Sequence, residues 1–184
     1  MNPFATATEL LADLRAGRVS SSELTEMYIG RIEKHDERLN AVVERDFARA
    51  REQARAADLG GGGVLRGLPI TLKESFNVSG LRTTCGVPAW KDFVSKHDAP
   101  TWMQLRGAGA VLLGKTNVPP MLQDWQSANA IYGRTSNPWD LGRTPGKQWW
   151  QRRRDRSGTE RARGRLRHRR LHPRARGVLR RLRP

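Results

Sequence analysis

The apolar positions near the start of the chain recur at helical spacing and predict two helices. Thr8 can cap a short helix that ends near Gly17. Ser20 and Glu23 have the spacing of a capping box, in which side chains and backbone N–H groups satisfy each other at a helix start. The apolar residues that follow fall on one face of this second helix: Leu24, Met27, Tyr28 and Ile32.

The next segment predicts a short strand and a third helix. Residues 41–43 are typical of a short strand, and Asp46 can cap the helix that follows. This helix is rich in Ala, Arg and Glu, a composition that suits an exposed surface. The glycines at 60–63 end it as a flexible turn.

Two further apolar runs have the length and the flanking residues of buried strands. The first lies within residues 65–73 and ends on Lys73, and the second spans residues 110–114. Residues 101–105, between them, favour a helix. Helices that alternate with short apolar strands predict an α/β fold. Residues 115–146 are rich in Pro, Asn and Gly and predict a long, structured loop region.

The positive charge of the chain is concentrated at its end. The net charge of the 184 residues is +16. Residues 1–146 hold 18 Lys/Arg against 16 Asp/Glu, whereas residues 147–184 hold 16 against 2. A strongly basic chain is typical of a nucleic-acid binder. Only the last segment has that character, and the first has the balance of an ordinary soluble enzyme domain.

The sequence contains no signal for export or for a membrane. Cys85 is the single cysteine, so an intrachain disulfide is excluded, which fits a reducing compartment. We find no basic start followed by an apolar run, the pattern of a signal peptide, and no apolar stretch near the roughly 20 residues that span a membrane. We therefore expect a cytoplasmic protein.

Lys73 is the residue most suggestive of chemistry, because it directly follows a predicted buried strand. An ammonium group that loses hydration there has a lowered pKa, and a neutral lysine can act as a general base. The alternative is a strand-end lysine whose stem is buried and whose amine reaches solvent. The spacing alone favours this second interpretation.

Three ordered blocks of sequence reverse that preference. They span residues 67–78, 114–119, and 132–140 with 142–146. The blocks resemble, in order, the catalytic-lysine strand, the GKTN-x-P element and the run before the Gly/Ser-rich motif of amidase-signature hydrolases. The resemblance covers nearly all of residues 1–146 and is weakest in the N-terminal helices.

The resemblance implies an incomplete amidase-signature fold, with a mixed β-sheet flanked by helices, and a Ser–Ser–Lys mechanism. In this mechanism the lysine deprotonates a serine in a cis peptide, which relays the proton of a second serine that attacks a carboxamide carbonyl. Lys73 matches the position of the lysine, and Glu74 departs from the commoner aspartate. The expected substrate is a small-molecule amide, and neither a cofactor nor a metal is implied.

Other notable residues have plainer interpretations. Lys115 is expected to be a structural hydrogen-bond donor in a loop. Cys85 is expected to pack rather than to act as a nucleophile, because no histidine pairs with it in a recognisable motif. Trp125 and Trp139 are expected in the core or in a pocket wall.

The resemblance ends after Gly146. The family continues with Gly-Ser-Ser-Gly-Gly and later with Gly-Ser-Asp-Ile-Gly-Gly-Ser-Ile-Arg, whereas this chain continues Lys-Gln-Trp-Trp-Gln-Arg-Arg-Arg. Ser157 is the only serine beyond position 146, and its surroundings match neither motif. We therefore divide the chain into residues 1–146, the N-terminal part of an amidase domain, and residues 147–184, an arginine-rich tail expected to be disordered.

The genetic code indicates an origin for this tail. If every codon is shifted by one base, the tryptophans at 149–150, which have a single codon, both become Gly, and residues 147–148 become only Ser or Asn. Residues 166–173 can then read Ser-Asp-Ile-Gly-Gly-Ser-Ile-Arg. The tail therefore has the pattern of the family's own coding sequence read out of frame, and a loss of two nucleotides after the Gly146 codon is the simplest event.

We weigh three functional hypotheses in a fixed order. The first is a truncated, frameshifted amidase whose family hydrolyses linear amides and which is itself inactive without the two serines. The second is a protein that binds nucleic acid or another polyanion, without specificity, through the basic tail. The third is a hydrolase activity that survives by complementation with another chain. The oligomeric state is left open.

Overall fold

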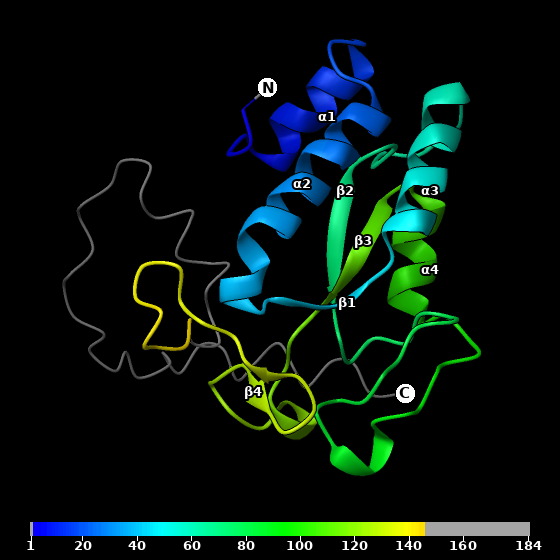
Figure 1. The fold of residues 1–184 in the computed structure, drawn as a ribbon. Coiled ribbons are helices and arrows are strands. Elements are labelled where there is room, and N and C mark those ends of the chain that lie inside the picture. The colour runs from blue at the N-terminus through cyan, green and yellow to red at the C-terminus, as the bar shows by residue number, and fades with distance from the viewer. Residues whose placement is uncertain (1, 146–184) are drawn as a thin grey trace, which may run out of the picture. The chain divides into compact units, whose positions relative to one another are not determined.

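A small mixed sheet lies at the centre of residues 2–145, the part of the chain that the computed structural model describes (Figure 1). The strands are β1 (Val42–Arg45), β2 (Pro69–Lys73) and β3 (Val111–Thr116). They are ordered β1-β3-β2, with β2 parallel and β1 antiparallel to β3. The predicted α/β fold with a mixed, helix-flanked sheet is confirmed. The predictions for the tail concern residues outside the described part of the chain.

Four helices surround the sheet, and their starts follow local capping rules. They are α1 (Ala7–Arg15), α2 (Ser21–Leu39), α3 (Phe47–Leu59) and α4 (Pro100–Gly107). The capping box of Ser20 and Glu23 is confirmed, as is the cap of α3 by Asp46. The cap of α1 is Thr6 rather than Thr8, because Thr6 forms its own capping box with Glu9. None of these helices is long and apolar enough to span a membrane.

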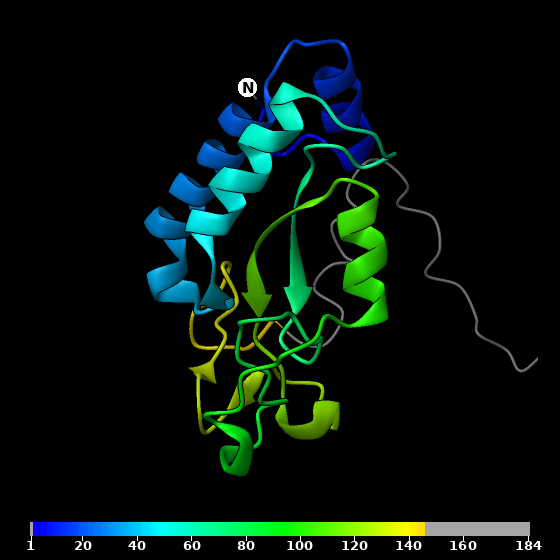
Figure 2. The same ribbon diagram turned by 90° about the vertical axis from the view of Figure 1, so that its right-hand side faces the viewer.

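Helices pack on both faces of the sheet (Figure 2). Ile29 of α2 and the alanines of α3 pack against one face of β3, and Trp102 of α4 packs against the other. Ala50 and Ala54 are fully buried, so the prediction that α3 suits an exposed surface is wrong for that side of the helix. Their small side chains let α3 lie close to the sheet.

Strand β3 continues two residues further than the sequence predicts. A side chain at Gly114 would place its Cβ 2.3 Å from the carbonyl oxygen of Glu44, so the glycine permits the close approach of β1 and β3. The strand therefore runs through Gly114 to Thr116. Lys115 consequently lies in the central strand and not in a loop, which corrects its predicted position.

The remaining segments gather beyond the carboxyl ends of β2 and β3 (Figure 1). Their short regular elements are η1 (Pro88–Trp90), η2 (Pro120–Leu122), β4 (Ala128–Asn129) and β5 (Gly133–Arg134). Asn117 Nδ2 donates to Gly133 O at 3.1 Å and to Thr135 Oγ1 at 3.0 Å, and Asn129 Nδ2 donates to Val118 O at 2.8 Å. These bonds confirm that the region is a structured loop.

Candidate active site

Lys73 is the last residue of β2, as predicted, but its side chain is exposed. Within residues 2–145, its amine takes part in no hydrogen bond or ion pair. The prediction that Lys73 is largely buried is therefore wrong. Neighbouring residues of a strand point to opposite faces. Leu72 packs into the core against Trp102, so Lys73 points away from that core at the end of the strand.

The buried lysine of this region is Lys115, whose side chain is completely inaccessible to solvent. Its Nζ donates to the carbonyl oxygen of Arg82 and to Thr83 Oγ1, the latter at 2.9 Å. The prediction that Lys115 is a structural hydrogen-bond donor is confirmed. Its partners belong to the segment that follows β2 in the chain, so Lys115 joins that segment to the central strand.

Glu74, the residue after Lys73, is also completely buried. Its two carboxylate oxygens accept hydrogen bonds from the backbone N–H groups of Thr84, at 2.5 Å, and of Cys85, at 2.9 Å. The hydroxyl oxygen of Tyr132 lies 3.3 Å from Glu74 Oε1. A buried carboxylate that accepts several such bonds is well solvated by the protein itself.

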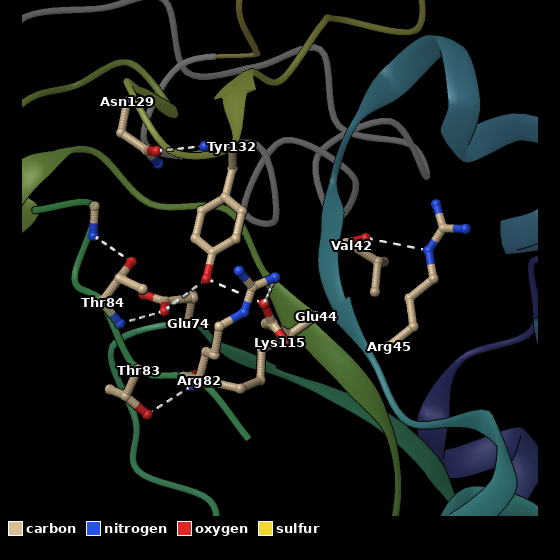
Figure 3. Close-up of polar contacts among 11 residues, drawn as sticks. Val42, Glu44, Arg45, Glu74, Arg82, Thr83, Thr84, Lys115, Asn129 and Tyr132 are labelled. Carbon is tan, nitrogen blue, oxygen red and sulfur yellow. Dashed lines mark hydrogen bonds and ion pairs between the residues drawn. The ribbon is translucent and has the colours of Figure 1, made fainter. Parts of the chain in front are cut away.

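Further polar contacts lie next to Lys115 and Glu74 (Figure 3). Arg82 forms an ion pair with Glu44 at 2.6 Å, and its guanidinium lies 5.6 Å from the centre of the Tyr132 ring. The Tyr132 hydroxyl is 3.2 Å from Glu44 Oε1. Asn129 Oδ1 accepts a hydrogen bond from the backbone N–H of Tyr132 at 2.8 Å. The loop near β4 and β5 is thereby connected to the sheet.

Burial and charge change the titration of three groups here. Burial lowers the pKa of Lys115 to about 8, although the charges of Glu74 and Glu44 oppose this shift. Burial, followed by the charge of Glu74, raises the pKa of Tyr132 and of Cys85. The raised pKa of Cys85 disfavours the thiolate, which is the nucleophilic form of a cysteine.

The lowered pKa of Lys115 predicts that alkaline pH stabilises the fold. Between its folded pKa of about 8 and its ordinary value of 10.5, the unfolded chain binds more protons than the folded chain. The free energy of unfolding should then rise by about 2 kcal/mol from roughly pH 7.5 to 9.5. Urea denaturation at both pH values measures this change.

The thiol must be removed for this measurement. The raised pKa of Cys85 acts in the opposite direction, because the unfolded thiol ionises first as the pH rises. We therefore specify the Cys85→Ser variant. A free energy of unfolding that stays constant or falls over this interval contradicts the assignment to Lys115.

The two tryptophans named from the sequence lie away from this core. The exposed fractions of the side chains of Trp125 and Trp139 are 65% and 83%, so the expectation of a core position is wrong. Both belong to the loops beyond the strand ends. Among residues 2–145, no group of three or more His, Cys, Asp and Glu side chains could hold a metal ion.

Comparison with known proteins places this geometry in a family. The family model described as Amidase matches residues 23–147. The chain belongs to the amidase family. A glutamyl-tRNA(Gln) amidotransferase subunit of Aromatoleum aromaticum is 42% identical over 146 residues, which cover 77% of this chain and 30% of the relative. The same subunit of Chromohalobacter salexigens is 41% identical over 145 residues, with the same coverage.

Solved structures agree with this membership in the amidase family. A 6-aminohexanoate cyclic dimer hydrolase has a TM-score of 0.73 at 32% identity, over 79% of this chain and 30% of that one. A fatty acid amide hydrolase has a TM-score of 0.74 at 28% identity, over 79% and 28%. This amidase-family chain thus spans about 30% of the length of the relatives that it matches.

Proposed function

We propose that residues 1–146 are the lysine-bearing part of an amide hydrolase and that Lys73 is its general base. The observation that carries this proposal is the position of Lys73 at the carboxyl end of β2, with an exposed side chain. Ligands of open α/β sheets bind outside the carboxyl ends of the strands. Lys73 is also the residue that matches the lysine of the family motif.

The proposed chemistry is hydrolysis of a carboxamide C–N bond through an acyl-enzyme. Lys73 accepts a proton from a serine, which in turn accepts the proton of a nucleophilic serine. The acyl group passes to this second serine, ammonia or an amine leaves, and water then releases the carboxylic acid. We propose a linear small-molecule amide as the substrate. Among the solved relatives is a fatty acid amide hydrolase, which supports this class.

We further propose that this chain is inactive, because both serines are encoded in a different reading frame. Residues 147–184 contain Ser157 as their single serine, outside any Gly-Ser motif. The one-base shift of these codons gives Ser-Ser-Gly-Gly, separated from Gly146 by the one codon that the two lost nucleotides would complete. A base without its nucleophile cannot form the acyl-enzyme.

The inactivity is tested with the purified 184-residue chain. We expect no turnover of a simple aryl or aliphatic amide above the uncatalysed rate, because nucleophile and base act as a unit. Lys73→Ala should leave this result unchanged. Turnover by the parent chain that Lys73→Ala abolishes would refute the inactivity and favour complementation or a surviving site.

The charge of residues 147–184 supports a second candidate function. Their 16 Lys/Arg against 2 Asp/Glu favour weak, salt-sensitive binding of polyanions without sequence preference. We rank this candidate second, because the shifted reading frame explains the arginines without any selection for binding. We also propose a cytoplasmic location, which the single cysteine, Cys85, supports.

A further inference from the structure

Two oppositely charged side chains, those of Lys115 and Glu74, are buried near the carboxyl ends of β3 and β2. Lys115 of β3 is paired with Leu72 of β2, and Glu74 lies two residues beyond Leu72. Both Lys115 and Glu74 are completely inaccessible to solvent. Within the described part of the chain, neither forms an ion pair with any residue at 4.0 Å or less. Buried charges persist only when other groups satisfy them.

The groups that satisfy this buried pair belong to one short segment, the 82–85 loop. The Lys115 ammonium donates to the carbonyl of Arg82 and to the hydroxyl of Thr83. The Glu74 carboxylate accepts from the two N–H groups that follow, those of residues 84 and 85. The Lys115 ammonium therefore binds the acceptor oxygens of residues 82 and 83, and the Glu74 carboxylate binds the N–H groups of residues 84 and 85 (Figure 3).

Backbone hydrogen bonds on either side of Glu74 fix the segment that carries Lys73. The N–H of Glu74 donates to Thr116 O at 2.9 Å, and the N–H of Phe76 donates to Lys73 O at 3.0 Å. Glu74 is thus held by its backbone to β3 and by its side chain to the 82–85 loop. Since adjacent residues point to opposite faces, this anchoring leaves the Lys73 side chain on the other face of the sheet.

We propose that Glu74 and Lys115 are positioning residues, which hold the 82–85 loop between them and thereby fix the backbone from which Lys73 projects. They act through Lys73 and do not contact substrate. The link to catalysis rests on the proposed function of Lys73. The mechanical link between the buried pair, the 82–85 loop and the Lys73 backbone is independent of that function. It can be tested directly in the full chain.

The test is amide hydrogen exchange, resolved to single residues, in the 184-residue chain. Thr83→Val removes only the side-chain acceptor of Lys115 and conserves volume. We expect the N–H groups of Thr84 and Cys85 to exchange about tenfold faster, although their acceptor is Glu74, because the loop loses one of its two anchors. The N–H groups of Glu74 and Phe76 should also exchange faster.

The matched control is Thr25→Val, since Thr25 is also buried but its hydroxyl has no partner among the described residues. This control should leave exchange in the 82–85 loop unchanged. The N–H groups of Ile29 and Ala54, in the interior of helices α2 and α3, report global unfolding. The inference is overturned if Thr83→Val leaves the loop unchanged, or if it accelerates the helix amides as much as the loop amides.

Kinetics of a chain with the restored reading frame separate this inference from the proposed function. Glu74→Gln should lower kcat by roughly tenfold to a hundredfold with little change in KM, because it displaces the base without touching substrate. Glu74→Asp, which keeps the charge, should recover part of kcat. If Lys73-dependent activity survives Glu74→Gln intact, the positioning role fails and the proposed function stands. If no Lys73-dependent activity exists, the proposed function fails, and the exchange data alone decide the mechanical link.

Discussion

Replacing Lys115 with Met is expected to lower the free energy of unfolding of the 184-residue chain by about 3–5 kcal/mol. The change removes a buried cation whose charge interacts favourably with that of the buried Glu74 carboxylate. It also leaves the Arg82 carbonyl and the Thr83 hydroxyl without their donor. Removing one member of a buried charged network destabilises the fold more than the complete network stabilises it, because the remaining members lose their partner. Urea denaturation of the parent and of the variant measures the difference.

The control for this prediction is Lys91→Met, because Lys91 is exposed. That variant should stay within about 0.5 kcal/mol of the parent. The double variant Lys115→Met/Glu74→Gln should lose less than the sum of the two single variants, because both residues belong to one network. A loss below about 1 kcal/mol for Lys115→Met alone would contradict the burial of a charged amine at this position.

Local sequence rules predicted most of the fold. The box of Ser20 and Glu23 and the cap of Asp46 involve partners three residues apart, so the signal lies within one helical turn. The short apolar run before Lys73 likewise predicted the end of β2. Thr6 was missed because Thr6 and Thr8 are both able to cap, and only the position of Glu9 distinguishes them.

The interior of the candidate site could not be predicted in the same way. Charged residues are seldom buried, so sequence reasoning places Glu74 and Lys115 near solvent unless their partners are known. Those partners are distant in the chain: Lys115 bonds Thr83, and Tyr132 reaches Glu74. The sequence indicated only that Glu74, Lys115 and Tyr132 lie in the three motif blocks. Membership in a motif block does not reveal which contacts a residue makes.

The burial of Lys73 and Lys115 could not be predicted from the sequence either. The sequence placed the buried amine at Lys73, and the structure buries Lys115 instead. Both lysines lie at the ends of apolar runs, and an apolar run does not reveal which face each residue takes once a register shift intervenes. Such a shift occurs between Ile70 and Thr71 in the pairing of β2 with β3.

Restoring two nucleotides after the Gly146 codon is expected to convert an inactive chain into an amide hydrolase. The restored frame should encode one codon after Gly146, then Ser-Ser-Gly-Gly, and Ser-Asp-Ile-Gly-Gly-Ser-Ile-Arg about twenty residues later, on the order of one helix and its connections. Both serines of the proposed mechanism then return together. Expression of the restored gene and assay with simple aryl and aliphatic amides measure the gain.

The most direct test of Lys73 as the general base is the rate of amide hydrolysis by this restored chain before and after Lys73→Ala. We predict Lys73-dependent turnover, with kcat/KM lowered by on the order of 10⁴–10⁶-fold in the variant, while the exposed control Lys91→Ala retains the parent rate. An early stop codon or the absence of Ser-Ser-Gly-Gly in the restored frame would contradict the frameshift and move polyanion binding to first place. Turnover that is the same with and without Lys73 would contradict its role as the base.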